Sequence, residues 1–268
     1  PDTMTSEGLS AISRLRAGLP EDAQRVLPTD SDIHELETLN LSGCWMTGLP
    51  PEISEFHALK RLVLSSCLNL VGFPLEICSL KDTLEDLELA GCRKLAALPP
   101  EIGALGSLES LNVSGCSLLM VLPPEIGSCV SLTTLNLSLC SLLSTLPPEI
   151  GSLVSLESLN VSGCSLLRVL PPEIGSCISL TALNLSMCIK LAELPVEVGQ
   201  LCELDSLDLR GCSLLKSVPA DIWALETLEY LDLRGTGLGA GAKSRGVSTL
   251  PGWDLVKSIG AAQIARMA

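Results

Sequence analysis

The chain has 268 residues, of which 47% are hydrophobic and only 2% aromatic, which favours many small identical layers over one irregular globular core. Its net charge of −14 makes nucleic acid and anionic membrane surfaces poor partners. Without a long apolar run or a basic-then-apolar leader, we expect no membrane insertion and no export signal.

The first segment, residues 1–35, is predicted to form an N-terminal helical cap. Ser6 suits the N-cap of a helix that carries Leu9, Ile12 and Leu15 on one face, and Pro20 opens a second short turn. The residues before Met4 leave open whether the chain begins there or is a segment of a longer protein.

Residues 36–238 consist of about nine copies of one pattern, in which Leu-x-x-Leu-x-Leu-x-x precedes a cysteine; the ninth copy ends in Thr236 instead. The alternation places the leucines on one face of a short strand. One unit cannot bury its own leucine row, but stacked units can, and each leucine then contributes about 1.5–3 kcal/mol. The pattern therefore predicts a solenoid with one short strand per repeat. The cysteines recur at intervals of 23, 25 and then always 24 residues: Cys44, Cys67, Cys92, Cys116, Cys140, Cys164, Cys188 and Cys212.

The return leg of most repeats contains Pro-Pro-Glu-Ile or a variant of it, as at Pro99 and Pro123. Proline is favoured in the first turn of a helix because its missing N–H would have no partner there, and glutamate suits the positive helix end. We expect short 3₁₀ or α turns in these segments.

The last segment, residues 239–268, is predicted to be a loop followed by a C-terminal capping helix. The sequence is glycine-rich up to Ser248, and Trp253, Val256, Ile259 and Ile264 then follow at helical spacing. A solenoid exposes its interior at both ends, so a covering helix is the simpler interpretation, and a partner-binding helix is the alternative.

The repeat pattern resembles the leucine-rich-repeat family over roughly residues 36–238. The variant with cysteine at the ladder position and Leu-Pro-x-x-Ile behind it is similar to repeats of plant and algal intracellular proteins, including disease-resistance receptors and Ras-group-related repeat proteins. The resemblance implies an α/β fold, a curved horseshoe with parallel strands, and a cytosolic module that holds a protein ligand on its concave sheet. The phosphate loop and kinase signatures of larger relatives do not occur in this chain.

The twelve cysteines follow the repeat, so we interpret them as buried free thiols in a reducing, cytoplasmic compartment. No Cys-x-x-Cys pair occurs and His34 and His57 are isolated, so we expect no zinc site and no other metal or cofactor. The acidic residues that begin the return legs are interpreted as helix-start charges rather than as a calcium ladder.

Five Asn-x-Ser triplets are formally glycosylation acceptors. Sugars on the concave sheet would fill the groove, so we interpret the triplets as a product of the repeat. They begin at Asn40, Asn112, Asn136, Asn160 and Asn184.

No nucleophile elbow and no pair of acids outside the repeat occurs, so the chain is not expected to be an enzyme. The concave positions of the central repeats are monotonous, and charged and aromatic side chains concentrate toward both ends. The chain's one tyrosine and its arginines are of the types enriched at binding hot spots. Strand residues that only pair among themselves are an equally weighted alternative. The candidate concave residues are Arg61, Asp86, Glu88, Asp208, Arg210, Tyr230, Asp232 and Arg234.

A second candidate surface is the edge beyond the strands. The position two residues after the cysteine is polar in three repeats, so it tolerates solvent, yet it is leucine in three successive repeats. A contiguous exposed apolar strip indicates an interface with a partner or with another copy of the chain, unless these side chains fold inward. The strip comprises Leu118, Leu139, Leu142, Leu166 and Met187.

The sequence thus predicts an interaction module, scaffold or adaptor for a protein partner of unknown identity. The alternative is a ligand-sensing segment of a larger immune or signalling receptor.

Overall fold

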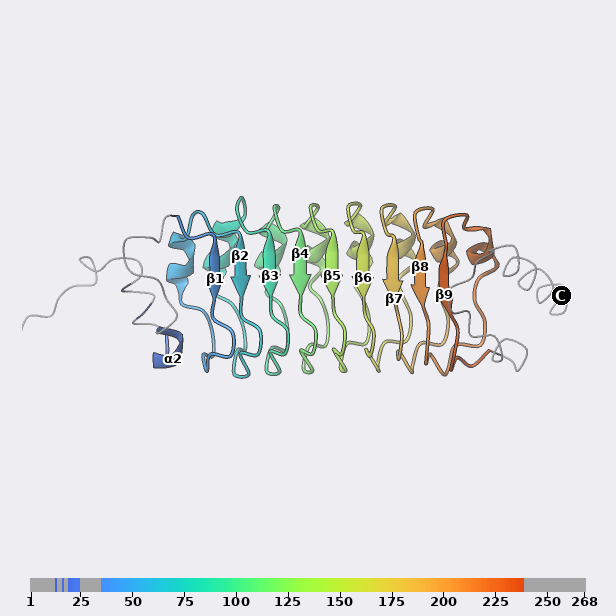
Figure 1. Ribbon diagram of the computed structural model, residues 1–268, viewed down its shortest axis with the longest axis horizontal. Helices are drawn as coiled ribbons and strands as arrows, with labels where there is room; N and C mark the ends of the chain where they lie inside the picture. The colour runs from blue at the N-terminus through green and yellow to red at the C-terminus, as the bar shows by residue number, and fades with distance from the viewer. Residues whose placement is uncertain (1–12, 14–15, 17–18, 25–34, 239–268) are drawn as a thin grey trace, which may run out of the picture.

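The computed structural model describes residues 13, 16, 19–24 and 35–238 of the chain. Within them, nine strands of three residues each form one parallel sheet, in which the spatial order equals the chain order (Figure 1). The predicted solenoid with one parallel strand per repeat is confirmed. The strands are β1 Thr38–Asn40, β2 Arg61–Val63, β3 Asp86–Glu88, β4 Ser110–Asn112, β5 Thr134–Asn136, β6 Ser158–Asn160, β7 Ala182–Asn184, β8 Ser206–Asp208 and β9 Tyr230–Asp232.

The strands pair so that equivalent positions of successive repeats lie side by side. In β4 and β5, for example, Leu111 pairs with Leu135, and Ser110 and Asn112 pair with Thr134 and Asn136. The central leucine of every strand is buried, while its two neighbours point to the opposite face, as a side-chain period of two requires. That opposite face, predicted to be concave, is called the sheet face below.

The return legs contain 3₁₀ helices, which lie behind the upper part of the sheet in Figure 1. In the helix between β3 and β4, Ile102 N–H donates to Pro99 C=O at 3.0 Å and Leu105 N–H donates to Ile102 C=O at 3.1 Å, so this helix is a single tight turn. This agrees with the short turns expected from the Pro-Pro-Glu-Ile segments. The helices are η2 Pro51–Glu55, η3 Leu75–Leu80, η4 Pro100–Ala104, η5 Pro124–Ser128, η6 Pro148–Ser152, η7 Pro172–Ser176, η8 Val196–Gln200 and η9 Ala220–Ala224.

The core is a continuous stack of leucine, isoleucine, valine and cysteine side chains between the sheet and the 3₁₀ helices. The ladder cysteines are buried, and from Cys67 to Cys212 each thiol donates to a backbone carbonyl of the preceding repeat at 3.1–3.3 Å. All twelve cysteines are free. The thiols therefore serve as small apolar side chains that also satisfy carbonyl groups between repeats.

Two cysteines depart from the expectation of burial. Cys202 is exposed and Cys78 is half-buried, whereas Cys129 and Cys177 are buried. Cys202 is exposed because of its register. Leu201 occupies the inward position before β8, so Cys202, one residue later, points to the surface.

At the N-terminal end, part of the predicted cap is described as the helix α2, Glu21–Gln24. Leu19 and Ala23 are buried in the core, and Asp22 accepts a hydrogen bond from the N–H of Trp45 in the first repeat at 2.9 Å. The remaining residues of the predicted N-terminal cap, and all of the C-terminal loop and capping helix predicted at 239–268, lie outside the described residues.

Candidate functional site

Strands β4 to β7 present a uniform polar surface on the sheet face. Their first exposed positions hold serine, threonine or alanine and their last positions hold asparagine. The predicted concave residues fall on either side of this stretch, on β2 and β3 and near β8 and β9. With strands about 4.8 Å apart, the two groups are separated by roughly 30 Å and form two clusters rather than one site.

In the N-terminal cluster the charged side chains pair with one another, although Asp86 Oδ1 is buried without a hydrogen-bond partner. Arg61 Nε lies 3.2 Å from a carboxylate oxygen of Asp86, and its Nη2 lies 3.8 Å from one of Glu88. The side-chain amide of Asn112 donates to the other oxygen of Glu88 at 2.8 Å. This cluster matches the alternative in which strand residues pair across the sheet.

The C-terminal cluster is built around Asp232, whose side chain is 1% exposed. Arg234 Nε donates to both carboxylate oxygens at 2.9 Å, and Tyr230 Oη donates to Oδ2 at 3.3 Å. The guanidinium of Arg234 remains half-exposed. The carboxylate thus anchors an arginine and the chain's one tyrosine at the C-terminal end of the sheet face.

Asp208 and Arg210 repeat this arrangement one strand earlier with a looser contact. Arg210 Nη2 lies 3.9 Å from Asp208 Oδ2, and 52% of the Arg210 side chain is exposed. An ion pair this exposed contributes little to stability, so the guanidinium remains able to contact an acidic or carbonyl group of a partner.

The ionisation of this cluster follows from burial and from the arginine. Burial raises the pKa of the Asp232 carboxyl, but the hydrogen bonds from Arg234 outweigh it and leave the pKa below its ordinary value. Burial and the neighbouring carboxylates Asp208 and Asp232 raise the pKa of the Tyr230 hydroxyl. At neutral pH the site therefore presents a neutral phenol beside arginines.

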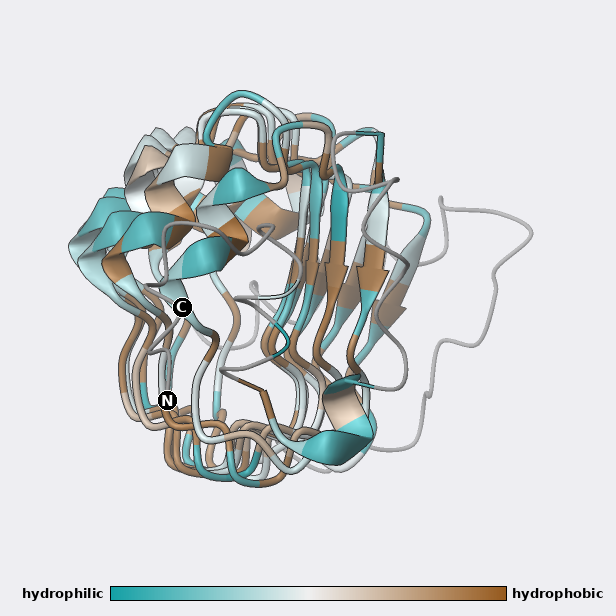
Figure 2. Cartoon of the chain, turned by 90° about the vertical axis from the view of Figure 1, so that its left-hand side faces the viewer, coloured by the Kyte–Doolittle hydropathy of each residue, from teal (hydrophilic) through white to brown (hydrophobic). Residues whose placement is uncertain are grey.

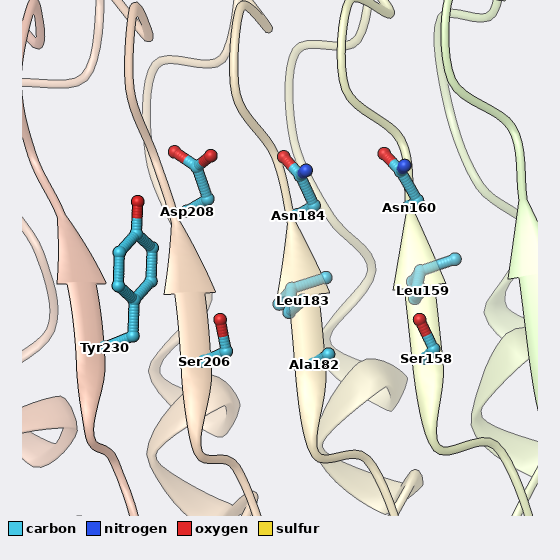
Figure 3. Close-up of a pocket in the computed structure, with 9 residues that line it drawn as sticks. All are labelled: Ser158, Leu159, Asn160, Ala182, Leu183, Asn184, Ser206, Asp208 and Tyr230. Atoms are coloured by element: carbon cyan, nitrogen blue, oxygen red, sulfur yellow. The ribbon is translucent and has the colours of Figure 1, made fainter.

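Tyr230 forms one wall of a hollow on the sheet face, with a volume of about 260 Å³. The residues paired in register before it are small, namely Ser206, Ala182 and Ser158, so the tyrosine ring stands above a low floor (Figure 3). This volume is below the roughly 300–1,000 Å³ of typical small-molecule sites, so the hollow suits a side chain of a protein ligand. Its polar rim consists of Asn160, Asn184 and Asp208.

The asparagines of the five Asn-x-Ser triplets have a structural role that the sequence interpretation missed. In each triplet the Asn Oδ1 accepts a hydrogen bond from the backbone N–H of the serine two residues later, at 2.9–3.0 Å. Asp208 and Asp232 accept the equivalent hydrogen bonds from the backbone N–H groups of Arg210 and Arg234. Seven of the nine strands end in Asn or Asp, residues that favour such turns, and this recurrence was the available signal.

The predicted apolar edge strip lies along the loops that follow the strands, at the bottom of Figure 2, where brown segments gather. Leu118, Leu139, Leu166 and Met187 are exposed, with Leu139 reaching 64%. Leu142 is half-buried, so it contributes less than predicted. The structure therefore presents most of the strip to solvent, and its role as an interface stays a prediction.

In the described part of the chain, no three His, Cys, Asp or Glu side chains are grouped so that they could hold a metal ion. The same residues include no helix with the length and apolar character needed to cross a membrane.

The family model described as Leucine Rich Repeat matches residues 35–56, 107–129, 131–153 and 155–177. The TMV resistance protein N of Nicotiana glutinosa is 37% identical over 91 residues, which are 34% of this chain and 7% of that protein. The protein SUPPRESSOR OF npr1-1, CONSTITUTIVE 1 of Arabidopsis thaliana is 34% identical over 97 residues, 29% of this chain and 7% of that protein. The matched region thus spans only a small part of either plant relative.

Solved structures share the fold. A leucine-rich-repeat protein of Leptospira interrogans is 32% identical, with a TM-score of 0.52 over 76% of this chain and 56% of that one. The leucine-rich-repeat domain of the type III effector XopL is 24% identical, with a TM-score of 0.57 over 82% of this chain and 87% of that one. Together with the nine-stranded parallel sheet, these matches identify the chain as a leucine-rich-repeat protein with repeats similar to those of plant disease-resistance proteins.

Proposed function

We propose that the chain is a non-catalytic adaptor that binds a protein partner on the C-terminal part of its sheet face. The observation that carries this proposal is the hollow walled by Tyr230, beside the half-exposed guanidinium of Arg210. Solenoid repeat proteins commonly use their extended concave surface for binding, and tyrosine and arginine are enriched among residues that dominate binding energy. The net charge of −14 favours a protein partner over nucleic acid.

The contacts further define the partner's chemistry. A segment that places one side chain in the hollow and an acidic or carbonyl group near Arg210 would use both features at once. The N-terminal cluster around Arg61 is self-paired, so we assign it no part in binding. The free, buried thiols are consistent with a reducing compartment, and we propose that the adaptor works in the cytoplasm.

The test is capture of the partner from the native cell with the tagged chain, followed by affinity measurements on the purified pair. Tyr230→Ser removes the wall of the hollow. Serine is the residue that the preceding strand has at the paired position, Ser206, so the strand should be preserved. Arg210→Glu reverses the loosely paired charge while leaving the backbone turn of Asp208 in place.

We expect each of these variants to weaken binding about tenfold or more, as loss of a hot-spot side chain does. Arg61→Glu, in the N-terminal cluster, is the matched control and should bind as the original chain does. Unchanged affinity in both Tyr230→Ser and Arg210→Glu would rule out this part of the sheet face as the binding site.

A second candidate function is ligand sensing within a larger immune or signalling receptor. It is favoured by the length of the two plant relatives, of each of which the matched region spans 7%. Sequencing the native transcript separates the two: a reading frame that continues into further domains supports the receptor, and one confined to Met4–Ala268 contradicts it.

A further inference from the structure

After the third strand, the two long edges of the solenoid carry opposite charge. Between residues 89 and 238, each repeat divides at its proline into a half that follows a strand and a half that leads from the proline to the end of the next strand. Arg210, Arg234, Asp208 and Asp232 pair on the sheet face and are left out of this count. The halves that follow strands then contain five lysine and arginine residues and one acid, Glu193. The halves from proline to strand end contain twelve acids and no lysine or arginine.

We name these surfaces by their places in Figure 1. The lower edge consists of the loops that follow the strands, and the upper edge consists of the loops that precede them together with the 3₁₀ helices. Lys94, Arg168, Lys190 and Lys216 belong to the lower edge, whereas Glu125, Glu149 and Glu173 belong to the helices of the upper edge.

Both edges also expose apolar side chains. On the lower edge, Leu118, Leu166 and Leu214 are 39–45% exposed, and Leu139 and Met187 are more exposed still. On the upper edge Val130, Val154 and Ile178, at equivalent positions of three successive repeats, are 48–62% exposed. Each edge thus combines an apolar row with charges of one sign.

Leu139 and Met187 bear a backbone cost that glycine at the same position avoids. Both have a φ of +61°, at a position where six other repeats use glycine, and the left-handed conformation costs a residue with a side chain about 1–2 kcal/mol. Their side chains lie across the glycines of the next repeat, Gly163 and Gly211, and remain largely exposed. Strain of this kind together with exposed apolar surface indicates a binding surface.

From the matching pitch and opposite charge, we propose that the occupant of each edge is a second copy of this chain, with the lower edge of one copy docked against the upper edge of the next. Both edges repeat with the same strand spacing, so apolar rows on two copies can align over several repeats. Lower-to-lower or upper-to-upper pairing would bring like charges together, whereas lower-to-upper pairing neutralises them.

The overall net charge of −14 does not prevent such a contact. Dissolved ions screen charges that lie more than about 8 Å apart at physiological salt, so the charges near the contact have the larger effect on association. Such a head-to-tail contact leaves one free edge at each end and allows open rows of molecules.

Sedimentation velocity of the full chain over rising concentration, up to about 1 mM, tests the proposal. The lower-edge variant is Leu139→Gly with Met187→Gly, which installs the residue of the neighbouring repeats, relieves the positive φ and should preserve the fold. The upper-edge variant is Val154→Lys with Ile178→Lys, at exposed positions whose equivalent before β2 is the exposed His57. Ser66→Gly makes the same backbone change outside the apolar strip and is the control.

We expect the original chain and Ser66→Gly to form species that grow with concentration, and each edge variant to weaken association about tenfold or more. A mixture of the two edge variants should form 1:1 dimers and nothing larger, because each supplies only one intact edge.

Three results would overturn the proposal. The first is an original chain that stays monomeric throughout the range. The second is loss of association in the lower-edge variant only, which would indicate a symmetric lower-to-lower contact. The third is a monomeric chain that sediments with phosphatidylserine vesicles through the basic edge, which would make that edge a lipid-binding surface.

Discussion

A Cβ atom placed on Gly151 would lie 2.4 Å from the backbone carbonyl oxygen of Glu173 in the next repeat. A similarly close approach recurs at Gly103, Gly127, Gly175 and Gly199, each against the acidic residue in the first turn of the following 3₁₀ helix. Glycine at this position therefore lets the helices of successive repeats stack without a gap, and the stack determines the shape of both the sheet face and the edges.

Gly151→Ala is consequently expected to destabilise the chain by about 1–3 kcal/mol, since backbone must move to admit the methyl group. Gly106→Ala is the matched control, because a Cβ there meets nothing within 4 Å, and its effect should stay within about 0.5 kcal/mol. Urea unfolding followed by circular dichroism measures both. Equal stability of the two variants would show that helix stacking does not limit this position.

Asp232→Asn should keep the strand-end turn, because five other strands use asparagine there, but lose the ion pair with Arg234. The folded-state pKa of Asp232 lies below its ordinary 3.8, so the charged carboxylate stabilises the fold above that pH and the stabilisation is lost as pH falls through the lowered value. The original chain should exceed the variant by about 1 kcal/mol near pH 6.

That difference should disappear at pH values below the lowered pKa, where the carboxyl is protonated. Unfolding free energies of both proteins, measured in parallel between neutral and strongly acidic pH, give the difference directly. A difference that persists unchanged in acid would mean that Arg234 does not stabilise the ionised form.

The thiols should react in two classes. Burial raises the pKa of Cys116 and of Cys140 to about 12, and the other buried ladder thiols behave alike, so they carry almost no thiolate at neutral pH. Iodoacetamide should modify Cys202 first and Cys78 more slowly in the native chain, and the remaining cysteines only after denaturation. Peptide mass spectrometry reads out the sites, and Cys202→Ser should remove the fast phase. Rapid labelling of Cys140 in the native chain would contradict the buried ladder.

Much of the fold could be predicted from the sequence because the repeat constrains it so heavily. The fixed interval between cysteines and the Leu-x-Leu alternation determine strand position, direction and register, as the pairing of Leu111 with Leu135 shows. The 3₁₀ helices follow from the Pro-Pro-Glu-Ile segments. The position of Cys202 was not predicted, because a shift of one residue relative to Leu201 moves a side chain from core to surface.

The candidate site was predicted less completely, because it depends on side-chain sizes on neighbouring strands. The sequence singled out Tyr230, but the hollow exists only because Ser206 and Ala182 stand beside it in register. Likewise, Arg61 and Arg210 are equal candidates for binding in the sequence. Only the structure distinguishes them, because Arg61 lies 3.2 Å from a carboxylate oxygen of Asp86 and Arg210 lies 3.9 Å from one of Asp208.

The most direct test of binding at the hollow uses the fact that Tyr230 is the only tyrosine in the chain. Incorporation of 3-fluorotyrosine therefore gives a single ¹⁹F resonance that reports on this wall of the site. Titration with the captured partner should shift or broaden that resonance in proportion to the bound fraction, and the Arg210→Glu chain should require more partner for the same effect. A resonance that stays unchanged while the partner is fully bound would contradict binding at the Tyr230 hollow.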